Sequence, residues 1–229
     1  AAPLGEEKRR QHHQHAHAQR AQRVGQLVAA HQRQVALALQ RRLGLPLLGT
    51  VPKTEEGGTP REALLDRKSE LVDSYIAVQT NLNFTTEHGI PRSFSVTSTR
   101  PAEGKSTTAL ALATVLARSG NRVILIDGDM RSPSIHHLAN VGHDRGVSNF
   151  LAGDDDYRGS VIRIEDLALD AMTAGPIPPN AAELLIGDRM RLLIERLHKD
   201  YDYVVVDSPP VMGLADAPLI AGHVEGVIY

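Results

Sequence analysis

A short loop that combines Gly104, Lys105 and Ser106 carries the residue types that bind a nucleotide phosphate. The backbone N–H groups of such a loop, and of the helix that follows it, can surround an anion with donors. A lysine at this place reaches the β- and γ-phosphates, and the serine hydroxyl completes the shell of a Mg²⁺ ion that bridges them. We therefore predict a strand, a phosphate-binding loop and a helix, in that order, over residues 92–120.

The loop departs from the usual pattern, G-x-x-x-x-G-K-[ST], in one position, because Thr99 stands where the first glycine is expected. Taken alone, the Gly-Lys-Ser triplet could also open an ordinary helix. The residues that we expect to contact ATP are Thr99, Arg100, Pro101, Ala102, Glu103, Gly104, Lys105, Ser106, Thr107 and Arg131.

Three carboxylates follow two aliphatic runs further along the chain. Residues 122–133, RVILIDGDMRSP, place Asp127 and Asp129 after the first run, and residues 203–210, YVVVDSPP, place Asp207 after the second. Continuous aliphatic runs are typical of parallel strands covered on both faces, whose ligands lie beyond the carboxyl ends. A single acid at such a place is usually a turn or cap residue. Three beside a phosphate loop indicate handling of Mg²⁺ and of a nucleophile.

Strands alternate with helices over the second part of the chain, which predicts an α/β fold with a doubly wound, mostly parallel sheet flanked by helices, as in P-loop NTPases. We expect helices at residues 62–84, 134–138 and 181–198, and a strand at residues 164–172.

The composition excludes several classes of protein. A hydrophobic fraction of 41% over 229 residues is enough for a full core, and a net charge of −2 gives no general attraction to nucleic acid. The absence of cysteine rules out disulfides, thiolate zinc sites and cysteine-bound iron–sulfur clusters.

The motifs AEGKST, ILIDGDMR and VVVDSPP resemble the Walker A, Walker A′ and Walker B motifs of the bacterial tyrosine kinases. Residues 174–211 also resemble the "GxxPPNPxELL" stretch that precedes Walker B in this family, so the resemblance covers residues 70–229. It implies ATP- and Mg²⁺-dependent autophosphorylation on tyrosine, coupled to the polymerisation and export of capsular or extracellular polysaccharide.

The resemblance also implies a role for each motif residue. Lys105 is similar to the phosphate-binding lysine, and Ser106, Asp129 and Asp207 would hold Mg²⁺, the two acids through water. Asp127 would act as the base that accepts the tyrosine proton. Arg131 would contact phosphate or a neighbouring subunit. Judged from its position in the sequence alone, it could equally be a surface cation.

The family resemblance further implies a membrane-embedded polysaccharide co-polymerase or activator, on the same or a separate chain, and tyrosine-containing protein substrates. The protein would be cytoplasmic, at the inner face of the bacterial inner membrane, and a possible homo-oligomer. The family's Glu-x-x-Arg-x-x-Arg pattern for ring assembly is replaced by Asp73, Ile76 and Gln79, which puts ring formation in doubt. The family's tyrosine cluster is absent, and the chain stops at Tyr229 inside a predicted strand, so we expect the natural protein to continue.

We interpret residues 1–60 as a basic, His/Gln-rich, juxtamembrane-like segment with an amphipathic helix at residues 24–42 and a linker, followed by a P-loop kinase or ATPase domain at residues 61–229. A solvated basic helix is the alternative reading. The tract HHQHAH, residues 12–17, could bind a transition metal, but such tracts are more typical of linkers.

Two other functions remain open. The first is an ATPase switch resembling MinD and ParA, but those proteins usually place an extra lysine near the start of the loop, where this chain has Ser98, Thr99 and Arg100. The second is a nucleotide-binding regulator of polysaccharide chain length that transfers no phosphate. The absence of the arginine pair and of the tyrosine cluster favours this alternative.

Overall fold

The computed structural model describes residues 34, 38, 40–42, 44–53 and 58–229. The chain divides into two units, Ala1–Thr50 and Val51–Tyr229. Within the predicted helix at residues 24–42, the few described residues are helical and exposed. The rest of that helix and the histidine tract at residues 12–17 lie outside the described residues. In the part that is described, none of the helices has the length and apolar character needed to cross a membrane.

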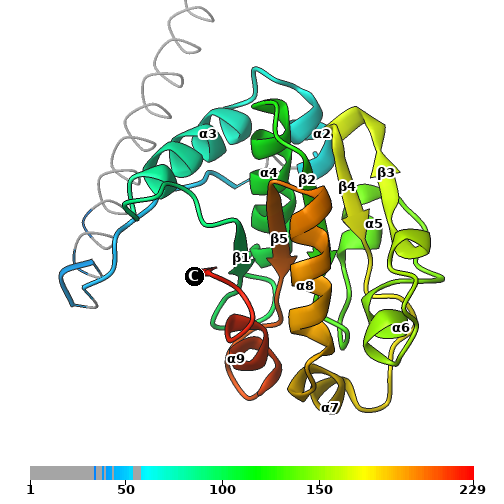
Figure 1. Cartoon of the computed structure of the whole chain (residues 1–229). Helices are drawn as coiled ribbons and strands as arrows, with labels where there is room; N and C mark the ends of the chain where they lie inside the picture. Colours follow the sequence, from blue (N-terminus) through cyan, green and yellow to red (C-terminus); the bar gives the residue numbers. More distant parts are fainter. Residues whose placement is uncertain (1–33, 35–37, 39, 43, 54–57) are drawn as a thin grey trace, which may run out of the picture. The chain divides into compact units, whose positions relative to one another are not determined.

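The second unit contains a six-stranded sheet in the order β3-β4-β2-β5-β1-β6, and only β3 runs antiparallel to its neighbour (Figure 1). This arrangement confirms the predicted mostly parallel, doubly wound fold. The strands are β1 (Ser93–Val96), β2 (Val123–Asp127), β3 (Ile162–Ile164), β4 (Leu169–Met172), β5 (Tyr203–Asp207) and β6 (Gly226–Ile228).

Helices cover both faces of this sheet (Figure 1). They are α2 (Pro60–Leu65), α3 (Glu70–Asn83), α4 (Lys105–Arg118), α5 (Ile135–Ala139), α6 (Val147–Leu151), α7 (Ala181–Ile186), α8 (Arg189–Asp200) and α9 (Asp216–Ala221). Two single-turn 3₁₀ helices, η1 (Arg158–Ser160) and η2 (Glu165–Leu167), lie beside the antiparallel edge strand.

The central strands are apolar on both faces because each face packs against helices. The face toward α8 is made of one set of alternating residues, Ile124, Ile126, Val204 and Val206, which form one core cluster with Met190, Leu193, Ile194 and Leu197 of α8. The intervening Leu125 and Val205 are fully buried too. Since side chains alternate along a strand, they belong to the opposite face, where α4 contacts β1, β2 and β5.

The register of β2 and β5 determines where the acids meet. These neighbouring parallel strands pair residue by residue, so that Asp127 lies opposite Asp207, and Asp207 also lies opposite Val96 at the end of β1. The phosphate loop follows β1. The loop and the acids therefore converge at the carboxyl edge of the sheet, as the sequence predicted.

The predicted helix at residues 62–84 is two helices. Helix α2 ends at Leu65, and Asp66 has an extended backbone. The second helix, α3, starts anew because the Ser69 side chain caps it by accepting a hydrogen bond from the Val72 N–H. The Ser69 cap starts a second helix inside a segment whose spacing of apolar residues had predicted a single helix.

Two other predicted elements are also divided. The helix expected at residues 181–198 breaks at Gly187, whose extended backbone separates α7 from α8. The strand expected at residues 164–172 is instead β3, η2 and β4, with Ala168 in the left-handed region at a φ of 59°. Strand β3 folds back antiparallel to β4. The short helix expected at residues 134–138 is α5.

Candidate active site

The loop between β1 and α4 ends in an open helix N-terminus. Gly104 occupies the N-cap position with a φ of +91°, and no side chain caps the first N–H groups of α4. Ala102 also has a positive φ of 63°, so the loop turns twice through the left-handed region. Uncapped N–H groups at the start of a 14-residue helix form a ready site for an anion.

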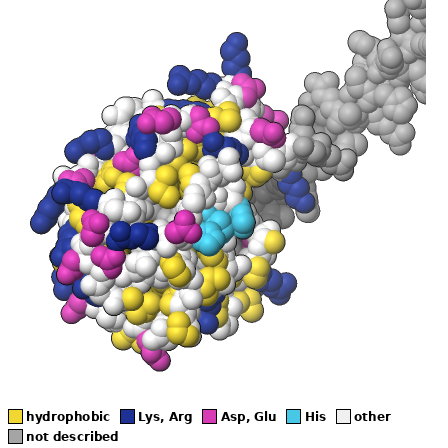
Figure 2. Space-filling model, turned by 90° about the vertical axis from the view of Figure 1, so that its right-hand side faces the viewer, with side chains coloured by type: hydrophobic (Ala, Val, Ile, Leu, Met, Phe, Trp, Pro, Cys, Tyr) yellow, Lys and Arg dark blue, Asp and Glu magenta, His cyan; other side chains and the backbone are white. Residues whose placement is uncertain are grey.

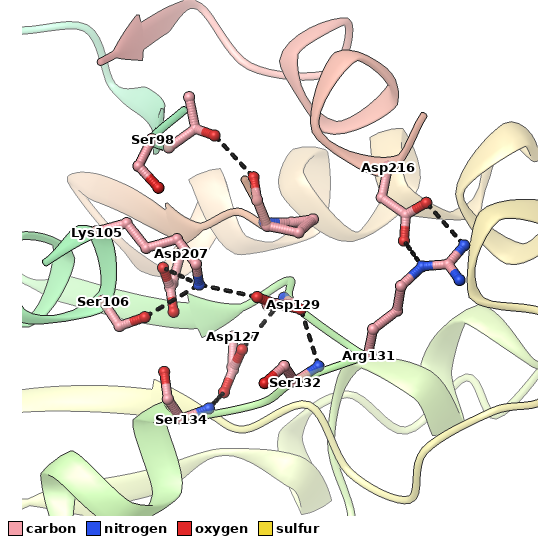
Figure 3. A network of polar contacts seen from close by, with 12 residues as sticks. Ser98, Lys105, Ser106, Asp127, Asp129, Arg131, Ser132, Ser134, Asp207 and Asp216 are labelled. Atoms are coloured by element: carbon pink, nitrogen blue, oxygen red, sulfur yellow. Dashed lines mark hydrogen bonds and ion pairs between the residues drawn. The ribbon is translucent and has the colours of Figure 1, made fainter. Parts of the chain in front are cut away.

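The amino group of Lys105 lies between two acids at this helix start (Figure 3). Its Nζ is 2.9 Å from Oδ2 of Asp129 and 3.3 Å from Oδ1 of Asp207, and it donates to Oγ of Ser106 at 3.1 Å. Burial opposes the charge on Lys105, but the carboxylates of Asp207 and Asp129 outweigh it and raise its pKa. The lysine is therefore charged. Its ammonium group lies where the oxygens of a bound phosphate could replace the two carboxylates as its partners.

Asp127 is fully buried beneath this cluster. Its Oδ1 accepts the Asp129 N–H at 3.2 Å, and its Oδ2 accepts the N–H groups of Ser134 and Ile135, each at 3.0 Å. Burial and then the nearby charge of Asp207 raise the pKa of Asp127 to about 7, although the two N–H groups at the start of α5 favour the carboxylate. Its protonation therefore changes near neutral pH.

Asp207 has one oxygen that nothing in the described part of the chain satisfies. Oδ1 faces Lys105, whereas the buried Oδ2 has no hydrogen-bond partner. Burial raises the pKa of Asp207 to about 6, and Lys105 limits the increase. An unpaired buried carboxylate oxygen near the Ser106 hydroxyl and Asp129 suits a hard cation with oxygen ligands such as Mg²⁺.

The described residues contain no cluster of three or more His, Cys, Asp or Glu side chains arranged to hold a metal ion. Mg²⁺ is usually held by one or two carboxylates together with substrate phosphates and water, and not by a cage of protein ligands alone. The donor set therefore fits an ion that arrives with a nucleotide.

Arg131 is fixed at the edge of the same site. Its guanidinium donates from Nε to Oδ2 of Asp216 at 2.7 Å and from Nη2 to Oδ1 at 3.1 Å (Figure 3). Asp216 opens α9 and is almost fully buried. Arg131 is thus a positioned side chain and not a free surface cation.

A cavity of about 510 Å³ lies above these groups. Its walls include most of the predicted loop residues together with Asp129 and Arg131. The residues that line it are Pro101, Ala102, Gly104, Lys105, Ser106, Thr107, Asp129, Arg131, Ser132, Ser134, His137, Leu138, Pro210 and Leu214. Asp127 and Asp207 lie buried beneath it.

Three predicted ATP contacts do not line this cavity. The hydroxyl of Thr99 shares a hydrogen bond with that of Tyr229, and the Glu103 carboxylate accepts the N–H of Arg100 at 3.0 Å. Conversely, the sequence did not predict four residues that line the cavity, namely His137, Leu138, Pro210 and Leu214. It also did not predict Asp216 as the partner of Arg131. Their only signal was that they lie on the segments leaving the two acid-bearing strands.

The first strand of the parallel sheet leads through an amide-lined loop into a buried helix, and a lysine, a serine and carboxylates lie at the edge of the sheet. This arrangement defines a P-loop NTPase. The comparisons agree. A family model described as "AAA domain" matches residues 92–222. The solved structure of MinD from Pyrococcus horikoshii, complexed with Mg-ADP, is 21% identical with a TM-score of 0.52, covering 59% of this chain and 56% of that one. That likeness shows the fold.

Closer likenesses show the family. The tyrosine-protein kinase YwqD of Bacillus subtilis is 36% identical over 166 residues, which are 72% of this chain and 70% of YwqD. The crystal structure of the chimerical protein CapA2B2 superimposes with a TM-score of 0.76 at 32% identity, covering 85% of this chain and 84% of that one. The chain belongs to the bacterial tyrosine kinases, enzymes that transfer a phosphoryl group from ATP to tyrosine.

Proposed function

We propose that this chain transfers the γ-phosphoryl group of ATP to a tyrosine hydroxyl with the residues described above. The observation that carries the assignment is the placement of Lys105 between Asp129 and Asp207 at the uncapped start of α4. Phosphoryl transfer needs positioning and charge neutralisation more than covalent help, and these groups offer both.

Under this proposal, the phosphate loop and the two acids bind different parts of the nucleotide and its metal ion. The first N–H groups of α4 would bind phosphate oxygens, and Lys105 would exchange its two carboxylate partners for the β- and γ-phosphates. Ser106, Asp129 and Asp207 would hold Mg²⁺, which when bound neutralises phosphate charge. The Mg-ADP in the MinD structure supports nucleotide and Mg²⁺ binding at this fold in general.

Asp127 is our proposed base. A group with a pKa of about 7 can both accept and release a proton at neutral pH, which favours general base catalysis. Its Oδ1 accepts one backbone hydrogen bond and keeps a second lone pair. Because Asp127 is fully buried beneath the cavity, a tyrosine hydroxyl would reach this lone pair only when nucleotide binding moves the groups above it. Asp129 is the competing candidate because it lines the cavity, so variants of both acids are needed.

The acceptor tyrosine is best sought on another chain or another segment. Four of the five tyrosine hydroxyls already have hydrogen-bond partners: Tyr75 shares one with Thr108, Tyr229 shares one with Thr99, and Tyr157 and Tyr201 donate to Asp200 and Asp170. The fifth, Tyr203, begins the central strand β5. We therefore infer transfer to tyrosines outside this folded unit, in a partner protein or in a second copy of the chain.

The cellular role that we propose is regulation of exopolysaccharide or capsule polymerisation and export. It rests on the resemblance to the bacterial tyrosine kinases, one of which is described as a putative kinase in the cps region of Klebsiella pneumoniae. The chain would act in the cytoplasm, at the inner face of the inner membrane, with a membrane-embedded co-polymerase as activator. A homo-oligomer is compatible with this role.

The test is incubation of the full-length protein and its membrane activator with Mg²⁺ and γ-labelled ATP, followed by mapping of the label. Phosphotyrosine that disappears in Lys105→Met would support the kinase. Release of phosphate without labelled tyrosine would favour an ATPase switch, to which the MinD likeness points. Nucleotide binding with neither product would favour the regulator of chain length.

A further inference from the structure

The lining of the nucleotide cavity includes two chemically different groups of residues. Pro101, Ala102 and residues 104–107 of the phosphate loop offer N–H groups, a lysine and hydroxyls. Leu138, Pro210 and Leu214, here called the apolar wall, offer aliphatic surface, and the polar residues Arg131, Ser132, Ser134 and His137 also line the cavity. Aliphatic side chains do not bind phosphate or Mg²⁺, so the apolar wall suits another part of a ligand.

The two leucines come from the segments that leave the two acid-bearing strands. Leu138 is on α5, which follows β2, and Leu214 precedes α9, which follows β5. Because β2 and β5 are parallel neighbours with Asp127 opposite Asp207, both segments start at the same point of the sheet edge. The apolar wall therefore lies on the side of the acids and Lys105, which is the γ-phosphate side of a P-loop.

Both segments are anchored to the reacting groups. The start of α5 is held by Asp127, whose Oδ2 accepts the N–H groups of Ser134 and Ile135. The start of α9 is held by the double hydrogen bond between Asp216 and Arg131. The leucines are thus placed relative to the acids by short, ordered connections, which a specific subsite requires.

The wider surface supports a docking function at this edge. Figure 2 shows charged side chains over the upper part of one face and hydrophobic side chains gathered on its lower part, the side toward which β4 and β5 point in Figure 1. Ile177, Ile186 and Met212 are among the exposed hydrophobic residues of the domain, with 64%, 68% and 59% of their surface accessible.

The ligand must combine a hydroxyl with an apolar body. A tyrosine side chain does so, since its ring requires apolar contact while its hydroxyl reaches the acids and the γ-phosphate. An adenine ring would lie at the opposite, α-phosphate end of the nucleotide. Serine and threonine have no ring to occupy such a wall.

We propose that Leu138, Pro210 and Leu214 form the subsite for the phenol ring of the acceptor tyrosine. This inference rests on the proposed kinase function and adds the residues that select tyrosine. The subsite receives its tyrosine from another segment or copy of the chain or from a partner, and it aligns the hydroxyl with the acids at the ends of β2 and β5.

The test uses Leu138→Ala, Leu214→Ala and the double variant in the full-length protein, with a soluble copolymer of glutamate and tyrosine as acceptor. Loss of apolar contact in such a pocket should lower kcat/KM for the copolymer about tenfold for each variant. The KM for ATP and the affinity for a fluorescent ADP analogue should stay within about twofold. Leu138→Met, which keeps the apolar volume, should retain most of the activity.

Leu65→Ala and Phe84→Ala are matched controls, because these side chains are exposed, do not line the cavity and lie outside the surface described above. Equal loss of ATP and acceptor affinity in the leucine variants would overturn the subsite, as would transfer at the wild-type rate. If the wild-type protein transfers no phosphate to tyrosine while it binds ADP, the kinase function itself is refuted. Folding of every variant is checked by its thermal midpoint.

Discussion

The guanidinium of Arg131 and the carboxylate of Asp216 form a two-pronged ion pair between residues that are 85 positions apart in the chain. Asp216 has a side chain only 2% exposed, whereas that of Arg131 is 45% exposed and faces the nucleotide cavity. The pair therefore connects the segment that follows β2 to α9, which follows β5. It holds one positive charge at the edge of the site.

We expect Asp216→Asn to lower kcat/KM for phosphoryl transfer at least tenfold, because the freed Arg131 no longer has a defined position. Arg131→Lys should not substitute, since an ammonium group cannot make the planar double contact. Steady-state kinetics of both variants give the measurement. Arg191→Lys, at an exposed pair within α8, is the control and should leave the rate unchanged. Full activity of Asp216→Asn would show that the pair is only structural.

Lys105→Met should lower turnover by roughly 30- to 900-fold. Removal of a charge-assisted phosphate contact in a site that excludes water costs on the order of 2–4 kcal/mol in the transition state. The variant also leaves Asp129 and Asp207 without their shared cation. Release of labelled phosphate and titration with an ADP analogue measure the effect, and Lys68→Met, at an exposed lysine, is the control. Unchanged turnover would contradict the proposed site.

Asp127→Asn should lose phosphoryl transfer while the affinity for ATP stays within about tenfold, since a base acts on the acceptor and not on nucleotide binding. Asp129→Asn should instead weaken Mg²⁺-dependent nucleotide binding. Parallel measurement of transfer rates and of ATP affinity at several Mg²⁺ concentrations separates the two roles. If both properties fall together in Asp127→Asn, this residue serves the metal.

Stability should fall as pH rises from about 4 to about 7. The pKa values of Asp127 and Asp207 are raised in the folded protein from an ordinary 3.8 to about 7 and about 6, so the folded state binds more protons than the unfolded chain in this window. The loss should exceed about 1 kcal/mol, since one pKa unit corresponds to roughly 1.4 kcal/mol. Urea unfolding at a series of pH values measures it.

Asp207→Asn supplies the control for this pH dependence. The substitution removes one of the two groups with a raised pKa. It also removes the nearby charge that, after burial, contributes most to the raised pKa of Asp127, so the stability of the variant should depend less on pH between 4 and 7. A slope as steep as that of the wild-type protein would mean that other groups cause the effect.

The sequence by itself determined the parts that depend on local pattern. The aliphatic runs of β2 and β5 predicted buried parallel strands, and the residues that end them predicted acids at the sheet edge. The Gly-Lys-Ser triplet predicted the helix start. Each of these signals lies within a few residues of the feature that it predicts, because backbone conformation and strand burial depend on neighbouring residue types.

Only the tertiary structure decided which distant residues meet. It divided two predicted helices at Ser69 and Gly187 and inserted a 3₁₀ turn into a predicted strand. It also placed Asp216 against Arg131 and set two leucines in the wall of the cavity. These contacts join segments that are far apart in the chain, and they depend on the register of β2 with β5, which the packing of the whole sheet determines.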